Sequence, residues 1–372
     1  MNDVQYEWGS APDRGYTMPD DAYLKLRQFL DRFPLGYPET PSGVEIKILK
    51  KLFSEEEARV AVLLSPLPEN VNSIAKRACM DEEPLSRLLE RMSLRGLIFR
   101  SKRSGETLYN AAPFMIGIYE YSVGKLDREL AALYREYYET AYQKEMGASN
   151  VPGFKAVPVG KNISPDIAIK PYRFIEDEIR AASSIAVASC ICRSEARING
   201  EGCGHDLETC LSFGVAAEYY IGNGIGRRIG ADEAIDILRR ADEAGLVHAC
   251  TNVRHLANIC NCCPCCCASL KGIAGKGLMR EKFFNPLYEP AFDAETCSSC
   301  SVCADRCPVA AIEIYIAPSV DRDRCLGCGL CATACPSGSI SMSPRADRRE
   351  PYSRMIELGF AILTKKHESG IT

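Results

Sequence analysis

Two stretches near the end of the chain, CSSCSVCADRCP at 297–308 and CLGCGLCATACP at 325–336, repeat one spacing of cysteines. Both follow the pattern C-x2-C-x2-C-x3-C-P, and the second copy begins 28 residues after the first. A tight loop with two residues between thiols can direct three sulfurs toward one metal cluster, and the more distant fourth sulfur can tie the two loops together. A zinc ribbon would instead show paired C-x2-C units, without triplets followed by C-P. The spacing therefore predicts cysteine-ligated iron–sulfur clusters here.

The repeat resembles the bacterial two-cluster [4Fe-4S] ferredoxins, over about 50 of the 372 residues. The resemblance implies that three cysteines of each run bind one cluster and that the fourth reaches across to the other. It assigns one [4Fe-4S] cluster to Cys297, Cys300, Cys303 and Cys335, and the second to Cys325, Cys328, Cys331 and Cys307. Gly327 and Gly329 would let the backbone approach a cluster and offer N–H groups to its sulfides.

The composition is that of a globular protein with enough apolar residues for well-packed cores. Of the 372 residues, 46% are hydrophobic and 25% are charged, which suggests two or three domains. The net charge of −4 argues against a broad electrostatic surface for nucleic acid.

Cysteine usage indicates a reducing compartment. Of the 20 cysteines, 19 lie between Cys190 and Cys335, and thiolates kept for iron and sulfide need protection from oxidation. Met1–Gly15 has no apolar segment of a secretory signal. The longest uncharged apolar stretches, such as 183–192, are far shorter than a membrane span. We therefore expect a soluble cytoplasmic protein of an anaerobe.

Residues 1–150 are expected to form a helical head. Ser54 and Glu57 form a capping-box pattern at the start of one helix, and Ser104-Gly105 suits the turn of a hairpin. The predicted elements are helices at Gly43–Leu52, Glu55–Leu64, Val71–Ala78 and Glu83–Arg95, followed by strands at Leu97–Arg100 and Thr107–Asn110. This order resembles a winged helix.

A winged helix raises the possibility of DNA binding. However, the helix that would read DNA opens with Asp81, Glu82 and Glu83, whose charges repel phosphate, so we do not expect nucleic acid as a partner. The favoured interpretation is a docking or dimerisation element, supported by the amphipathic stretch Leu126–Lys144, whose tyrosines are expected to serve packing. A homodimer is one form that this element allows.

Residues 151–290 are expected to form a small α/β domain rich in cysteine, with cysteines gathering where strands end. Pro152–Asn162 has the composition of a linker into this domain. The predicted elements are a helix at Tyr172–Ala182, a strand at Ser184–Cys190, helices at Asp206–Tyr220 and Ala231–Ala244, and a strand at Leu246–Cys250.

The middle domain holds eleven cysteines, enough for at least one further iron–sulfur cluster within residues 190–267. Adjacent cysteines alternate in direction, so the run from Cys260 to Cys267 cannot all serve one cube. Arg193 would supply positive charge beside an anionic cluster. About a third of these thiols are expected to be inert and buried. The preferred ligand set is drawn from Cys192, Cys203, Cys210, Cys260, Cys263 and Cys266.

Three other features of the middle domain carry weaker functional signals. The glycines from Gly222 to Gly230 do not fit a nucleotide-binding loop and are expected to form a turn. His205, His248 and His255 are expected to be hydrogen-bonding neighbours of the cysteines. The run 261–264 faintly resembles the cysteine-rich CCG modules of heterodisulfide reductases, with proline where that pattern has glycine.

Together these features predict an α+β multidomain protein. Its parts are a winged-helix-like head (1–150), a cysteine-rich α/β middle domain (151–290), a ferredoxin-like 2[4Fe-4S] domain (291–345) and a C-terminal helix within 346–372. The whole is similar to multidomain 4Fe-4S ferredoxin-type proteins of anaerobes.

The leading functional hypothesis is an electron-transfer subunit that passes single electrons to or from a partner oxidoreductase, such as a flavoprotein. One alternative is a reductase with its substrate site on a middle-domain cluster. Another is an iron–sulfur redox-sensing transcription regulator. The sequence leaves open whether the protein is itself an enzyme.

Overall fold

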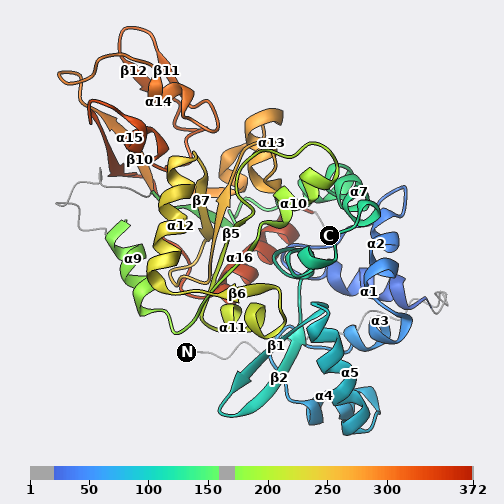
Figure 1. Cartoon of the computed structure of the whole chain (residues 1–372). Helices are drawn as coiled ribbons and strands as arrows, with labels where there is room; N and C mark the ends of the chain where they lie inside the picture. Colours follow the sequence, from blue (N-terminus) through green and yellow to red (C-terminus); the bar gives the residue numbers. More distant parts are fainter. Residues whose placement is uncertain (1–20, 159–171, 371–372) are drawn as a thin grey trace.

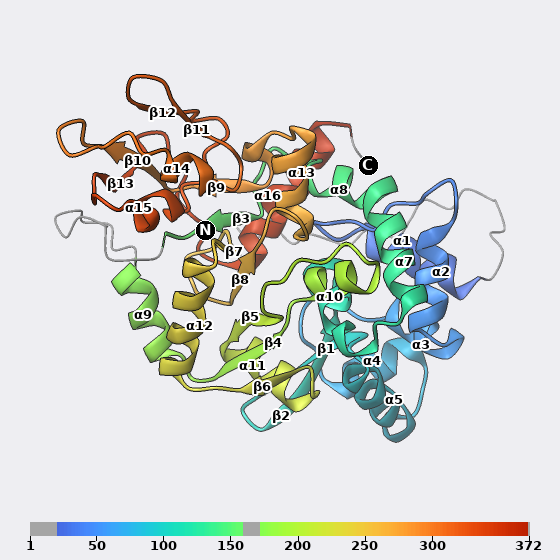
Figure 2. The same ribbon diagram turned by 45° about the horizontal axis from the view of Figure 1, so that its top comes forward.

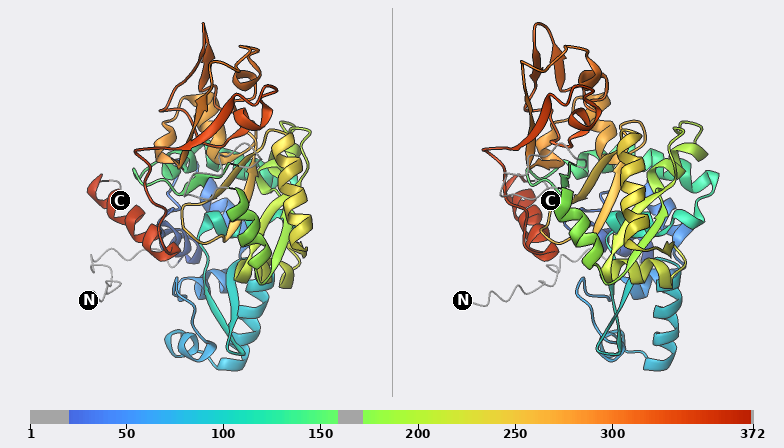
Figure 3. Two further views of the ribbon diagram at one scale, coloured as in Figure 1. Left: turned by 90° about the vertical axis from the view of Figure 1, so that its left-hand side faces the viewer. Right: turned by 60° about the vertical axis from the view of Figure 1, so that its left-hand side comes forward.

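The computed structural model describes residues 21–158 and 172–370, so the N-terminal stretch Met1–Gly15 lies outside the described residues. The head carries a hairpin of strands β1 (Ile98–Arg103) and β2 (Glu106–Ala111). Figure 3 shows this hairpin at one end of the molecule and the orange and red C-terminal cysteine-rich unit at the other. Within the described ranges, no helix combines the length and apolar character needed to cross a bilayer.

The head has the predicted succession of helices and hairpin. The Glu57 N–H donates to Ser54 Oγ over 3.3 Å, and the Ser54 N–H donates to the Glu57 carboxylate over 2.8 Å, which confirms the capping box. Ser104 and Gly105 both have positive φ, as a tight two-residue hairpin turn requires. These elements fit the winged-helix resemblance, which remains a prediction. The helices are α1 (Ala22–Asp31), absent from the prediction, α2 (Val44–Leu52), α3 (Glu55–Ala61), α4 (Val71–Ala78) and α5 (Glu82–Leu94).

Aromatic side chains fill the core of the head. The Phe114 ring lies 4.4 Å from Tyr37 and 5.7 Å from Tyr137, between ring centroids. Tyr134, Tyr137 and Tyr138 are buried, which confirms their expected role in packing. The amphipathic stretch forms the helices α7 (Arg128–Tyr137) and α8 (Gln143–Met146), which are joined by a π-helical turn at Tyr138–Tyr142. A short helix, α6 (Tyr119–Tyr121), precedes them.

The middle of the molecule is a seven-stranded sheet in the order β6-β4-β5-β8-β7-β3-β9. All neighbours pair antiparallel except β3 and β9, which pair parallel. Figures 1 and 2 show this sheet between the C-terminal unit and the head. Its strands are β3 (Phe154–Ala156), β4 (Ile185–Ser189), β5 (Glu208–Phe213), β6 (Gly226–Arg228), β7 (Val247–Thr251), β8 (Asn258–Cys262) and β9 (Phe284–Pro286).

The two faces of the sheet have different coverings. In β4, Ile185 and Val187 join an apolar cluster with α9 (Tyr172–Ala181) and α12 (Ala231–Glu243). The alternate residues Ala186 and Ala188 pack with α11 (Gly214–Gly222) and the head. This alternation follows the two-residue period of a strand. Two further helices, α10 (Ile191–Ile198) and α13 (Ala268–Lys276), follow β4 and β8.

Three local predictions in this region were wrong, and one strand was missed. The helix expected at Asp206–Tyr220 is instead strand β5 followed by α11, because residues 208–213 pair with β4 and β8 inside the sheet. Within the expected linker, Phe154–Ala156 forms β3, while residues 159–162 lie outside the described residues. The expected glycine turn contains β6 at the sheet edge, and the cysteine run opens in a strand, β8, that was not predicted.

The C-terminal unit is built from two small antiparallel pairs and two short helices. The first strand of the unit, β10 (Tyr288–Phe292), pairs with its last strand, β13 (Ile340–Pro344). Between them in the chain, β11 (Ile312–Ile314) pairs with β12 (Pro318–Val320). The helices α14 (Val302–Asp305) and α15 (Leu330–Ala334) carry the third cysteine of each run. Strand β10 begins three residues before the expected boundary at 291.

Polar contacts fix this unit on the middle domain. The Arg306 guanidinium donates to the carbonyl oxygens of Asp242 and Glu243 over 2.5 and 2.6 Å. These carbonyls end α12, where the helix dipole favours a cation. Arg280 donates to the carbonyl oxygens of Arg322 and Asp323. The cysteine-rich unit is therefore held in one orientation on the sheet.

The last helix, α16 (Met355–Glu368), lies within the predicted range 346–372 and packs back on the body. Leu358 and Ile362 are buried with Val151 and Val253. The Lys366 ammonium lies 2.5 Å from the Glu145 carboxylate, and both side chains are at most 10% exposed. This buried ion pair joins the end of the chain to the head.

Replacing Lys366 with methionine should destabilise the protein, because it leaves the buried Glu145 carboxylate unpaired. We expect a loss of about 3–5 kcal/mol in the free energy of unfolding, measured by urea denaturation. The matched control is Lys365→Met, whose exposed pair with Glu368 should contribute less than about 1 kcal/mol. Equal losses of unfolding free energy in the two variants would contradict the stabilising role of the buried Lys366–Glu145 pair.

Candidate metal centres

The C-terminal unit gathers its cysteines around two hollows. The outer hollow is lined by Cys297, Cys300, Cys303 and Cys335. The inner hollow is lined by Cys307, Cys325, Cys328 and Cys331. Each run therefore places its fourth cysteine in the hollow of the other run, which is the exchange implied by the ferredoxin resemblance.

Backbone geometry around the inner hollow suits a cluster. Gly327 and Gly329 have positive φ, and a Cβ on Gly327 would lie 2.3 Å from the carbonyl oxygen of Tyr288. The Gly327 N–H donates to Cys325 Sγ over 3.4 Å, and the Ala311 N–H donates to Cys307 Sγ over 3.2 Å. Four thiols with backbone N–H donors form the ligand shell of an iron–sulfur cluster. The residues present therefore fit a [4Fe-4S] group.

The inner hollow is also the more buried one. Burial raises the pKa of the Cys331 thiol to about 12. A thiol must lose its proton to bind a metal, so metal binding at this position must offset that burial. In the outer hollow, burial raises the pKa of Cys335, but hydrogen bonds from Ser337 and Ser339 outweigh it and lower the pKa to about 7.

In the middle domain, six cysteines form a chain of interacting thiols, which we name the thiol row. Each thiol lies close enough to the next to shift its pKa, and Cys260 also accepts a hydrogen bond from the Asn258 side chain over 3.8 Å. The order along the row is Cys190, Cys192, Cys267, Cys262, Cys260 and Cys210.

The pleat of the sheet explains this row. Cys260 and Cys262 are two residues apart in β8 and point to the face that the head covers. Their strand neighbour β5 pairs Leu211 with Ile259, and the same antiparallel register brings Cys210 beside Cys260. The remaining members precede or begin helices: Cys190 and Cys267 are the N-cap residues of α10 and α13. Helix N-termini favour anionic groups, as metal-bound thiolates are.

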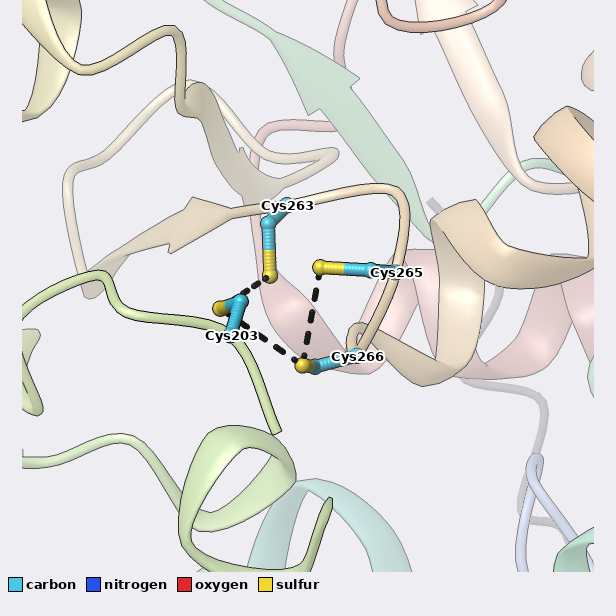
Figure 4. Close-up of side chains that lie close together, drawn as sticks. All are labelled: Cys203, Cys263, Cys265 and Cys266. Carbon is cyan, nitrogen blue, oxygen red and sulfur yellow. Dashed lines mark hydrogen bonds between the residues drawn. The ribbon is translucent and has the colours of Figure 1, made fainter. Parts of the chain in front are cut away.

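A second group, which we name the thiol tetrad, consists of Cys203, Cys263, Cys265 and Cys266. Its four sulfur atoms all lie within 4.8 Å of one another (Figure 4). In residues 21–158 and 172–370, no other set of three or more histidine, cysteine or acidic side chains is so compact. Cys265 is exposed, whereas Cys263 and Cys266 are buried.

Arg193 lies between the two groups and is fully buried. Its guanidinium donates to the carbonyl oxygen of Asn261 over 2.8 Å, reaches Cys263 Sγ at 4.0 Å, and contacts the Thr209 hydroxyl. The charged neighbours that most affect its pKa in the described part of the chain are cysteines and not carboxylates. Burial lowers the pKa of Arg193, but the nearby cysteines, Cys190 and Cys263 foremost, raise it by more, so the net pKa lies above its ordinary value. Sulfur atoms are thus the groups beside this buried cation that can carry a negative charge once they bind a metal.

Cys250 belongs to neither group. Strand β7 turns it to the opposite face of the sheet, among Ile237, Leu238 and Ile259. Burial there raises its pKa to about 12, as for an inert core thiol. His248 is also buried, and burial lowers its pKa to about 4, although a hydrogen bond with Asn261 opposes that shift. His248 is thus a neutral hydrogen-bonding neighbour.

The six middle-domain cysteines chosen from the sequence divide evenly between the groups. Cys192, Cys210 and Cys260 lie in the thiol row, and Cys203, Cys263 and Cys266 lie in the thiol tetrad. Sequence reasoning missed Cys190, Cys262, Cys265 and Cys267. The two-residue period of a strand would have separated Cys260 and Cys262 from Cys263, but residues 258–262 were not predicted to be a strand.

Comparison with known proteins identifies one segment. A family model described as 4Fe-4S binding domain matches residues 318–341. This match covers β12, the second cysteine run and the first residues of β13, and does not include the first run. No curated protein and no solved structure matches the chain. The chain carries a 4Fe-4S ferredoxin-type segment, and its cysteine-rich groups support an iron–sulfur electron-transfer role.

Arg193→Met should destabilise the middle domain and reduce its metal content, because the sulfur groups lose their buried counter-charge. We expect a loss of about 3–5 kcal/mol in the free energy of unfolding, with the iron of the C-terminal unit retained. Metal analysis and urea denaturation test this, with Arg240→Met on the exposed side of α12 as control. An Arg193→Met protein with full metal content and stability would contradict this role.

Proposed function

We propose that the protein is an iron–sulfur electron-transfer protein with two [4Fe-4S] clusters in its C-terminal unit and a further cluster in the thiol row. The observation that carries the proposal is the exchange of fourth cysteines between the outer and inner hollows. Clusters of this kind take up and release one electron at a time. The protein's own residues bind them, exclude water and set their distance from a partner.

The arrangement supports a path from the outer hollow inward. Cys325, Leu326 and Leu330 of the inner hollow belong to the same continuous apolar cluster as Cys262 and Cys267 of the thiol row. The contacts of Arg306 with the end of α12 hold the two parts together. Centres at the outer hollow, inner hollow and thiol row would therefore form a fixed series.

The outer hollow also has features that suit contact with a partner. Cys300 is exposed. The β11–β12 turn beside it presents Tyr315 and Ile316, which are 82% and 96% exposed. Large apolar side chains at a redox site favour docking of another protein. We infer that a redox partner, such as a flavoprotein, exchanges electrons at this end.

The variants Cys300→Ser and Cys328→Ser should each lose about four irons per chain, because each substitution removes one ligand from a different cluster. Cys328→Ser should in addition slow electron flow from the outer hollow to the thiol row. Iron and acid-labile sulfide on protein purified without oxygen, with EPR of the reduced protein, provide the measurement. Cys79→Ser, in the head and away from every cysteine group, is the matched control.

Unchanged iron in both variants would show that the two hollows do not bind clusters. Normal iron loss with unchanged electron flow to the middle domain would instead contradict the proposed series of centres.

Ile316→Asp should slow electron exchange with a protein partner by about tenfold, the effect of losing an apolar interface contact of about 1.4 kcal/mol. Iron content, EPR spectra and reduction by small dyes should stay unchanged. Stopped-flow mixing with a ferredoxin-reducing flavoprotein measures the rate. Met355→Asp, at another exposed apolar residue on α16, is the control, and equal slowing in both variants would argue against docking at the outer hollow.

A further inference from the structure

We propose that the thiol tetrad binds a single zinc ion, separate from any iron–sulfur cluster in the protein. Cys203, Cys263, Cys265 and Cys266 supply four thiolates and thus a complete tetrahedral shell. Such a closed site is structural, because no position is left for substrate or water.

The distances between the sulfur atoms favour one ion. The Sγ atoms are separated by 3.8 Å for Cys203 and Cys263, 3.7 Å for Cys203 and Cys266, and 3.6 Å for Cys265 and Cys266. Four sulfurs placed tetrahedrally at about 2.3 Å from one zinc ion lie about 3.8 Å apart. Thiolates on a cubane bind four different irons at the outer corners of a cube, so they must stand farther apart.

The C-terminal unit provides an internal comparison. Its two sets of four cysteines surround hollows, and neither set has all its sulfurs within 4.8 Å of one another in the described part of the chain. The same protein therefore has cysteine sets of two sizes, a wide one suited to clusters and a narrow one suited to an ion. Tetrahedral four-sulfur coordination by a single ion is typical of zinc.

Groups around the tetrad would stabilise the ion. Four thiolates around a divalent ion leave a net negative charge, and the Arg193 guanidinium lies 4.0 Å from Cys263 Sγ. The backbone N–H of His205 lies beside the Cys203 sulfur, and Arg197 fixes this loop by donating to the carbonyl oxygens of Cys203 and His205. Such outer contacts orient metal ligands and tune the ion.

The position of the tetrad indicates what the ion would do. Cys203 lies in the loop after α10, and the other three ligands lie in the turn between β8 and α13. One ion would therefore tie the segment that carries Cys190 and Cys192 to the segment that carries Cys260, Cys262 and Cys267. It would hold the two sides of the thiol row in register without taking part in electron transfer.

Metal analysis of the full chain purified without oxygen tests this proposal. We expect about one zinc per chain in the wild type, and its loss in Cys265→Ser and Cys203→Ser with the iron of the C-terminal unit retained. Cys265 is exposed, so its substitution should be tolerated by the fold. Cys262→Ser, in the thiol row, is the reciprocal control and should keep zinc while losing iron.

A second measurement needs no variant. Zinc-edge X-ray absorption of the wild type should show four sulfur neighbours at about 2.3 Å and no neighbouring iron. The proposal is overturned if the wild type has no zinc, if the tetrad holds a mononuclear iron, or if Cys265→Ser loses cluster iron instead. Because iron and zinc are counted in the same sample, failure here is distinct from failure of the electron-transfer proposal.

Discussion

A buried cation among sulfur atoms is the constraint on which the middle of this molecule depends. Arg193 is fully buried, and its partners are an Asn261 carbonyl, the Thr209 hydroxyl and the Cys263 sulfur. Removing a guanidinium from water costs several kcal/mol unless an opposite charge compensates it. Here sulfur atoms are the neighbouring groups that can carry that charge. Metal binding is the ordinary way in which proteins keep buried thiols ionised.

The sheet places the cysteines of the middle domain in separate groups. In β8, alternate residues face opposite sides, so that Cys260 and Cys262 point toward the head while Ile259 packs under α12. Where the strand ends, the backbone turns and brings Cys263, Cys265 and Cys266 to Cys203. Cys250 lies on the face covered by α12, where no other sulfur belongs to the same cluster. A single strand and the turn after it thus supply cysteines to two differently spaced thiol groups.

The C-terminal unit is joined to this centre by contacts that resist reorientation. Arg306 caps the last carbonyls of α12, and Thr333 lies 3.4 Å from the Asp242 carboxylate. Burial raises the pKa of Asp242 to about 6, although Thr333 and Arg306 oppose this shift. The inner hollow shares an apolar cluster with the thiol row, whereas the outer hollow faces solvent beside Tyr315 and Ile316. This arrangement, exposed at one end and packed against the body at the other, suits the proposed transfer of electrons between a partner and an internal centre.

The sequence by itself determined the features that depend on near neighbours. The C-x2-C-x2-C-x3-C-P runs predicted the two cysteine sets of the C-terminal unit, and the Ser54 capping box and the Ser104-Gly105 hairpin turn formed as predicted. These features need only short loops and local hydrogen bonds. Tertiary structure alone decided which middle-domain thiols meet, because that depends on strand register. Residues 208–213 form a strand only through pairing with β4 and β8, and that pairing brings Cys210 to Cys260. The placement of Arg193 between the groups likewise required the sheet, since its partners lie 16 to 70 residues away in the chain.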